Sequence, residues 1–401
     1  MAKYYKFREN LQFTMKEILY GEVFLAKTEE LNDPLDSRIV YTFQNDEILL
    51  KNFINVLFNF IHFSRFDTDD IATNIYLYFE RKNQRKFDYL DLVDFFKSDT
   101  FESIVMYYYS IKDKILFNNI VETILSNLNG IMGNNTYISS FTINPNETLM
   151  WSHYGNQHKG ICLEFSSDYN RLYGNPQWPD MQKIVKPENS QEENRPAIMK
   201  FHKVEYGDTP PTINGYKAFH SIVDRSVYEN DLFKDYAVNK YSKWSYEDEY
   251  RLIDASQCFA QTNINKSAVN RIFYYDQTQL TGLIFGLRVS ETDKNEIVST
   301  IIEMRTKLFE FTHILPIFIF YQARLENDNY LINTDYIIKI LDFENNEISV
   351  EELNKSKENY YSILKELADK YPSKDYAIYK ECRISQNSEY LEFLNSQNLI
   401  E

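Results

Sequence analysis

A long block of helical periodicity interrupts a chain that otherwise carries many short strand-like segments. Residues 46–129 place apolar side chains at three- and four-residue steps, as at Phe53, Val56 and Phe60. This spacing is typical of amphipathic helices that pack against one another. Strand-like segments lie on both sides of the block. We therefore expect a mixed α/β (α+β) fold, in which a twisted, mostly antiparallel sheet carries a large helical insertion and a helical C-terminal tail.

Short runs of apolar, aromatic and β-branched residues predict the strands of that sheet. They are residues 4–8, 23–26, 137–143, 160–165, 199–206, 249–253, 271–275, 282–285 and 315–321. Helical spacing is found at residues 12–20, 216–238, 290–308 and 350–397, and the polar run 187–195 is expected to be a mobile loop. These patterns predict an α/β core of residues 1–45 and 130–335, an insertion of residues 46–129 and an appendage of residues 336–401.

The composition narrows the class of partner. The net charge is −16, and an acidic chain repels the phosphate backbone, so non-specific nucleic-acid binding is not expected. Cys162, Cys258 and Cys382 form no CxxC pair, which favours a reducing compartment and disfavours a zinc site. No signal peptide and no apolar run long enough for a bilayer are visible. We predict a cytoplasmic protein without a membrane anchor or a bound metal.

Two stretches carry residues with chemical potential near the first strand and the central strands. Arg8 ends the first strand, where a guanidinium can form a fork of hydrogen bonds with a phosphate or carboxylate; the alternative is a surface ion pair. Ser139 and Ser140 are consecutive hydroxyls on a strand, so they face opposite sides of it. Trp151, His153 and Tyr154 follow them, either as ligand contacts or as core and structural residues.

A third stretch, residues 244–252, concentrates charge at the start of a predicted strand. If the segment is extended, Glu247, Glu249 and Arg251 point to one face, and Tyr250 lies between them on the other. This arrangement suits either a catalytic carboxylate or a ladder in which Glu249 and Arg251 form an ion pair. The sequence has no phosphate-binding glycine loop, no dinucleotide-binding glycine motif, no nucleophile elbow and no zinc-protease motif.

These landmarks resemble those of a bacterial family called domain of unknown function 2971, over residues 3–333. The resemblance is carried by residues 5–8, 31–36, 150–155, 158–161, 244–251 and 321–323. The order of the Met-Trp-Ser-His-Tyr-Gly and Trp-Ser-Tyr-Glu-Asp-Glu-Tyr-Arg elements is its most specific part. The insertion and the C-terminal tail are less typical of that family.

A second resemblance is to ADP-ribosyltransferases, which bind NAD without a glycine motif. In chain order they use an arginine on a first strand, a serine-bearing strand and a Glu-x-Glu element. The resemblance implies that Glu249 stabilises an oxocarbenium-like centre and that Glu247 orients an acceptor. It also implies that NAD is bound by the remaining candidates, which are Arg8, Ser139, Ser140, Trp151, His153, Tyr154 and Tyr250. Arg8, Ser139 and Glu249 are expected to face one cleft.

The favoured hypothesis is therefore an NAD-consuming enzyme, similar to an ADP-ribosyltransferase or an NAD glycohydrolase, that acts as an intracellular toxin or anti-phage effector. Its acceptor would be an unidentified protein or nucleic acid, and a partner protein would regulate it. One alternative is a non-enzymatic ligand- or partner-binding protein, in which these elements form a structural network. Another is a metal-dependent nuclease, if Asp33, Asp36, Glu247 and Glu249 converge.

Overall fold

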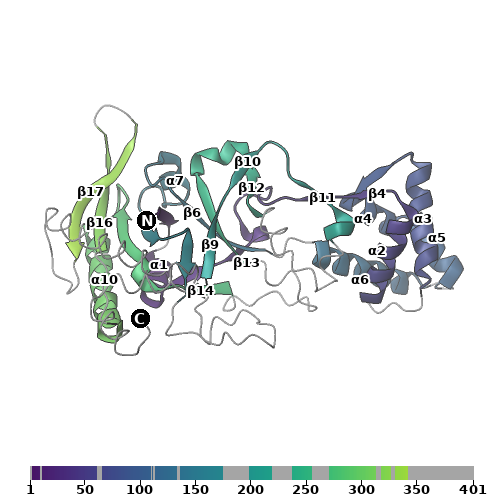
Figure 1. Cartoon of the computed structure of the whole chain (residues 1–401), viewed down its shortest axis with the longest axis horizontal. Helices are drawn as coiled ribbons and strands as arrows, with labels where there is room; N and C mark the ends of the chain where they lie inside the picture. The colour runs from purple at the N-terminus through teal and green to yellow at the C-terminus, as the bar shows by residue number, and fades with distance from the viewer. Residues whose placement is uncertain are drawn as a thin grey trace, which may run out of the picture.

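The computed structural model describes most of the chain outside the C-terminal region (Figure 1). The described residues are 2–9, 11–60, 66–109, 111, 113–132, 136–174, 198–218, 237–254, 271–312, 318–326 and 330–341. The mobile loop predicted at 187–195 and the helical tail predicted at 350–397 lie outside these residues, as does most of the helix expected over 216–238.

A ten-stranded sheet forms the core, and nine of its strands follow the order β17-β16-β15-β7-β1-β6-β13-β9-β8, with β3 pairing on β6. Neighbours pair antiparallel except β15 and β16, which are parallel. The strands are β1 Ala2–Arg8, β3 Ala26–Lys27, β6 Tyr137–Thr142, β7 Ile161–Ser167, β8 Arg171–Tyr173, β9 Ile198–Lys203, β13 Glu249–Asp254, β15 Leu280–Phe285, β16 Phe318–Leu325 and β17 Ile332–Leu341. The predicted fold class, a mixed α/β protein with a mostly antiparallel sheet, is confirmed.

Helices cover both faces of this sheet because its strands present apolar side chains on both sides. On one face, Tyr4, Phe141 and Leu163 pack with Ile18 of α1 (Leu11–Tyr20) and with Ile301 of α10 (Glu291–Thr312). On the other face, Phe7 and Cys162 pack with Trp151 of α7 (Thr148–His153). We call these the α1 face and the α7 face. Successive residues of a strand therefore enter two different environments.

A second body gathers at the far end of the molecule from β17 and α10 (Figure 1). Its helices are α2 Glu47–Phe60, α3 Thr68–Arg81, α4 Tyr89–Lys97, α5 Asp99–Tyr109 and α6 Lys114–Met132. They share one hydrophobic core with β4 (Val40–Gln44), β5 (Lys86–Asp88) and β11 (Thr212–Asn214), which form a small sheet of their own. The chain enters this body through β4 and leaves it after α6 to form β6 of the core, and β11 is added to the body from a later part of the chain.

Short elements complete the core around the strands named above. They are β2 Glu22–Phe24, β10 Glu205–Gly207, β12 Asn239–Tyr241, β14 Ile272–Tyr274 and the 3-10 helices η1 Thr28–Glu30, η3 Ser242–Glu247 and η5 Gln277–Gln279. Strand β10 pairs in parallel with β12, and β14 pairs with β2. Within the described ranges, no helix has the length and apolar character needed to cross a membrane.

Candidate functional site

Arg8 and Glu249 lie on opposite faces of the sheet. Tyr5 of β1 and Glu249 of β13 are both directly opposite Thr142 of β6, so these three side chains share the α7 face. Arg8 follows Tyr5 by three residues on an unbroken strand and therefore points to the α1 face. The expectation that Arg8, Ser139 and Glu249 face one cleft is wrong, because the odd spacing between Tyr5 and Arg8 reverses the side chain's direction.

A pocket of about 320 Å³ opens where β1 ends. Its wall is made by the end of β1, the first turns of α1 and the residue that follows α7, and the lining residues are Phe7, Arg8, Glu9, Phe13, Thr14, Glu17 and Tyr154. This volume lies near the lower end of the range for small-molecule sites. Of the predicted site residues, Arg8 and Tyr154 line this pocket, and Glu249 does not.

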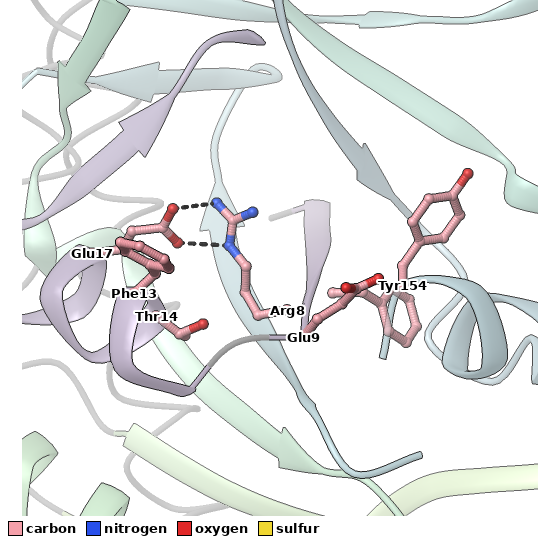
Figure 2. Close-up of a pocket in the computed structure, with 7 residues that line it drawn as sticks. Arg8, Glu9, Phe13, Thr14, Glu17 and Tyr154 are labelled. Atoms are coloured by element: carbon pink, nitrogen blue, oxygen red, sulfur yellow. Dashed lines mark hydrogen bonds and ion pairs between the residues drawn. The ribbon is translucent and has the colours of Figure 1, made fainter. Parts of the chain in front are cut away.

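The Arg8 guanidinium is held by a carboxylate of the neighbouring helix. Its Nη2 donates to Glu17 at 2.8 Å, and its Nε lies 2.6 Å from the other oxygen of the same carboxylate. Figure 2 shows the third nitrogen, Nη1, directed away from Glu17 and toward the side of the pocket where Glu9 and Tyr154 lie. Burial lowers the pKa of Arg8, although Glu17 opposes the shift. An arginine remains cationic through such a shift, and Nη1 is its one nitrogen that makes no contact with Glu17.

Glu249 and Arg251 belong to a buried ion-pair network on the α7 face. Arg251 is fully buried and donates through Nε to Glu249 at 2.7 Å, and through Nη2 to both oxygens of Asp36 at 2.8 and 2.7 Å. Its Nη1 donates to the Ser37 hydroxyl and to the Ala237 carbonyl. The guanidinium is therefore saturated with acceptors, as a buried cation must be to offset its lost hydration.

Lys240 of β12 extends the network from Glu249 to Glu247. Its Nζ donates to Glu247 at 2.6 Å and to Glu249 at 2.9 Å, and lies 3.5 Å from Asp36. The indole ring of Trp244 lies 5.2 Å from the same ammonium group. Three carboxylates thus share two cations in a buried site, which leaves one negative charge in excess.

The excess negative charge acts differently on the two glutamates of the Glu-Asp-Glu element. Burial favours the neutral form of both, but Arg251 and Lys240 outweigh burial at Glu249 and bring its pKa down to about 2. Burial also raises the pKa of Glu247, and there Glu249 adds to the increase while Lys240 only partly opposes it. Of the two glutamates, Glu249 is therefore the fixed anion and Glu247 the more readily protonated.

Tyr154 connects the pocket with this network. Its hydroxyl donates to Glu247 Oε1 at 2.8 Å and accepts from Asn32 Nδ2 at 3.0 Å. Burial, followed by the charge of Glu247, raises the pKa of Tyr154 well above its ordinary value, so the phenol stays protonated. The ring of Tyr154 lines the pocket while its hydroxyl is tied to the buried charges, so the network fixes one wall of the pocket.

The serine strand divides between the two faces. Ser139 lies on the α1 face, is buried, and accepts a 2.6 Å hydrogen bond from Lys6 Nζ, which also donates to the Ser140 carbonyl at 3.0 Å. Burial and the nearby Arg8 lower the pKa of Lys6. Ser140 lies on the α7 face, where its hydroxyl hydrogen-bonds Glu249. Neither serine lines the pocket.

The three remaining predicted residues also lie away from the pocket. Trp151 is fully buried, packs edge-on against Phe7, and donates its indole N–H to the Pro145 carbonyl, so it is a core residue. His153 is exposed near the end of α7. Tyr250 packs edge-on against Tyr4 on the α1 face. The predicted roles of Trp151 and Tyr250 in binding NAD are therefore not supported by their positions.

The loop from Gly155 to Gly160 packs against the end of β1. A Cβ atom added at Gly160 would lie 2.2 Å from the Arg8 carbonyl oxygen, and one at Gly155 would lie 2.8 Å from the Trp151 carbonyl oxygen. Asn156 and the two residues after it have positive φ angles, and Asn156 Nδ2 lies 3.5 Å from the Glu9 carbonyl oxygen. This loop therefore needs glycine at both ends to approach the strand that carries the pocket.

The carboxylates proposed for a metal site are bound to cations of the protein. Asp36, Glu247 and Glu249 converge on Lys240 and Arg251, and Asp33 instead accepts from the Leu35 amide outside this cluster. Among the described residues, no group of three or more His, Cys, Asp or Glu side chains is arranged to hold a metal ion. The gap ringed by carboxylates that the nuclease hypothesis requires is thus filled by an ammonium and a guanidinium group.

Sequence reasoning missed most of the pocket lining. Glu9, Phe13, Thr14 and Glu17 were not selected, and neither was Lys240. The sequence could have indicated part of the pocket, because Phe13 and Glu17 are four residues apart on a helix that directly follows Arg8, so both face the same side. No sequence pattern indicated Lys240, since its partners lie at positions 36, 247 and 249 and only the fold brings them together.

Comparison with known proteins gives one result. Residues 150–252 match the family model described as "Protein of unknown function (DUF2971)", so the chain carries this domain over those residues. The match includes Tyr154, Lys240, Glu247 and Arg251 but is shorter than the resemblance predicted over residues 3–333. No curated protein and no solved structure matches the chain, and nothing in the comparisons supports the resemblance to ADP-ribosyltransferases.

Proposed function

We propose that this protein binds a small planar ligand in the pocket at the end of β1, and that the buried ion-pair network is the framework behind it. The observation that carries the proposal is the pocket lining. It combines aromatic rings from Phe7, Phe13 and Tyr154 with an arginine nitrogen and two carboxylates. A mostly apolar cavity with a few converging polar groups is the usual form of a ligand site.

The buried ion-pair network fits this proposal because its charged residues have a structural role. Glu247, Glu249 and Arg251 have almost no exposed surface, and their charged atoms contact one another, Lys240 and Asp36. Such groups orient a structure and are poorly placed to meet a substrate. This assignment corresponds to the alternative hypothesis of a binding protein in which the Glu and Arg elements form a structural network.

The binding proposal is tested by calorimetric titration of the purified full chain with NAD, nicotinamide and adenosine monophosphate. We expect saturable binding of a ligand from this set, and Phe13→Ala should weaken it because Phe13 is an exposed ring at the pocket. Tyr107→Ala is the matched control, since Tyr107 is an exposed ring on the helical body. Absence of binding by all three compounds, or equal affinities in both variants, would refute the proposal.

An NAD-consuming enzyme is the second candidate, and the two carboxylates beside Arg8 favour it. In that reaction the bond between ribose C1′ and the nicotinamide nitrogen breaks, and nicotinamide leaves with the bonding electron pair. Water or an acceptor nucleophile then bonds to C1′ and loses a proton. A carboxylate near the ribose would stabilise the developing positive charge. Glu9 lines the pocket and Glu249 does not, so this role moves from Glu249 to Glu9.

Nicotinamide release from NAD, measured with and without cell extract, tests the second candidate. If the reaction occurs in the pocket, Glu9→Gln should lower the rate by roughly 10²–10³ without changing the melting temperature. Glu122→Gln, at an exposed position of α6, is the control and should release nicotinamide at the wild-type rate. No release in any mixture would refute this candidate and leave the binding proposal in place. The toxin or anti-phage role stays a proposal that depends on this reaction.

A further inference from the structure

The charge of the pocket is negative, although an arginine lines it. Arg8 uses Nε and Nη2 on Glu17, and the pair is largely shielded from solvent, with 22% and 15% of the two side chains exposed. A fork of two contacts between a guanidinium and a carboxylate neutralises both groups at short range. Nη1 is the one guanidinium nitrogen that makes no contact with Glu17 (Figure 2). Because the charge of Arg8 is already paired with Glu17, Arg8 is a poor anchor for a pyrophosphate.

Glu9 adds a second carboxylate that Arg8 does not neutralise. Its side chain is exposed and lines the pocket, and no described residue forms a hydrogen bond or ion pair with its carboxylate. Its backbone carbonyl faces Asn156 of the glycine-bounded loop at 3.5 Å, which places Glu9 at the rim. Two carboxylates and one guanidinium thus leave the pocket with one negative charge in excess.

The excess negative charge favours a cationic ligand, and three aromatic rings add to this preference. Phe7 is almost fully buried and packs edge-on against Trp151 at 4.9 Å, whereas Phe13 is 69% exposed. Tyr154 completes the set from the α7 side. The face of an aromatic ring carries partial negative charge and attracts cations. Rings and carboxylates in the same pocket therefore favour a flat group with a positive charge.

We infer that the pocket selects a planar cation bearing a carboxamide and rejects anions. The carboxamide oxygen would accept from Arg8 Nη1, and the Glu9 carboxylate would face the positive charge at the ring nitrogen, while the ring lies against the aromatic side chains. The pyridinium ring of NAD has this chemistry, so within the proposed function, on which this inference rests, the pocket is the site of the nicotinamide end. This replaces the expectation that Arg8 forms a fork of hydrogen bonds with a phosphate of NAD.

The test is a competition among four probes of similar size on the full chain, followed by ligand-observed NMR. N-methylnicotinamide, here the compound methylated on the ring nitrogen, is a cation with a carboxamide, nicotinamide is neutral, and nicotinate and inorganic pyrophosphate are anions. We expect N-methylnicotinamide to bind best and both anions to bind at least about tenfold more weakly, because like charges repel across a few ångströms. Glu9→Gln should reduce the preference for the cation over nicotinate by about tenfold. Glu122→Gln should leave it unchanged.

The outcomes separate this inference from the proposal beneath it. Anions that bind as tightly as the cation, or a preference that survives Glu9→Gln, would overturn the inference while ligand binding stands. NAD that binds without being displaced by N-methylnicotinamide would overturn it too, because the nicotinamide end would then lie elsewhere. Failure of NAD and of every probe to bind would overturn the proposed function itself, and the inference with it.

Discussion

Tyr154 donates a 2.8 Å hydrogen bond to Glu247 and thereby joins the wall of a pocket to a buried network of five charges. The ring of Tyr154 lines the pocket, while Glu247 shares Lys240 with Glu249 and Asp36. The two residues are far apart in sequence, and the fold brings together Tyr154, which directly follows α7, and Glu247, which ends η3. Measurements on single variants can therefore separate the part of this assembly that meets a ligand from the part that supports it.

Glu249→Gln is expected to destabilise the fold. The substitution leaves Arg251 and Lys240 with one fewer buried anion, and breaking a buried pair in this way costs roughly 3–5 kcal/mol. Urea unfolding of the variant and of Glu122→Gln measures the difference in free energy. Ligand affinity of the folded fraction should stay close to wild type. A variant that is as stable as wild type but has lost binding or turnover would return Glu249 to a catalytic role.

The network should also give the stability of the fold a defined dependence on pH. Because the pKa of Glu249 falls from 4.5 to about 2 on folding, its contribution is fully present above pH 4.5 and is lost as the pH falls toward 2. Glu247 acts with the opposite sign, because its pKa is raised: it opposes folding as the pH rises above 4.5. Urea midpoints between about pH 5 and about pH 3 should fall less steeply for Glu249→Gln than for wild type. An identical slope for both proteins would contradict this account.

Lys240→Met should cost about as much stability as Glu249→Gln, because three buried carboxylates would then share a single arginine. Adding Glu247→Gln to this variant removes one of the uncompensated charges. We expect the double variant to be more stable than Lys240→Met alone, which would reveal a coupling between the two positions. Thermal unfolding is measured for wild type, Lys240→Met, Glu247→Gln and the double variant. Purely additive effects of the two substitutions would show that Lys240 and Glu247 do not interact.

Tyr154→Phe keeps the ring at the pocket and removes the donor to Glu247. We expect a loss of about 1–3 kcal/mol in the free energy of unfolding, because a buried acceptor loses one of its partners. The affinity for a planar ligand should change little, since the ring face is retained. Tyr169→Phe is the control, at a tyrosine that is 60% exposed. A large loss of affinity without a loss of stability would show instead that the ligand contacts the hydroxyl.

Gly160→Ala should disrupt the pocket from outside it. The new methyl group would lie 2.2 Å from the Arg8 carbonyl oxygen, so β1 or the loop must shift, at a cost of about 1–3 kcal/mol or more. We expect lower stability together with weaker ligand binding. Gly207→Ala is the matched control, because the nearest atom to its added methyl group lies 3.8 Å away. Equal melting temperatures for the two variants would mean that the close approach at Gly160 does not affect the stability of the fold.

The sequence by itself determined the class of fold and most of the strands that build it. Short runs of apolar, aromatic and β-branched residues predicted β1, β6, β7 and β13, and the three- to four-residue spacing predicted the helices that share the second core. The sequence also predicted that Glu249 and Arg251 share a face, because residues two apart on a strand point the same way, and it left an ion pair between them as the alternative to a catalytic role for Glu249. Such local patterns can be recognised in the sequence because the burial of a residue depends on its position within its own helix or strand.

Only the tertiary structure decided which of these residues meet. Arg8 and Glu249 were expected in one cleft, but the register of β1, β6 and β13 sends them to opposite faces of the sheet, and a shift of one residue would have reversed that result. The partners of Arg251 include Asp36, which comes before the helices of the second body in the sequence, whereas Arg251 comes after them. Glu17 neutralises the arginine that the sequence suggested for phosphate. Long-range pairing and the charge of each enclosed space are properties of the assembled sheet, because they depend on which distant residues its strands bring into contact.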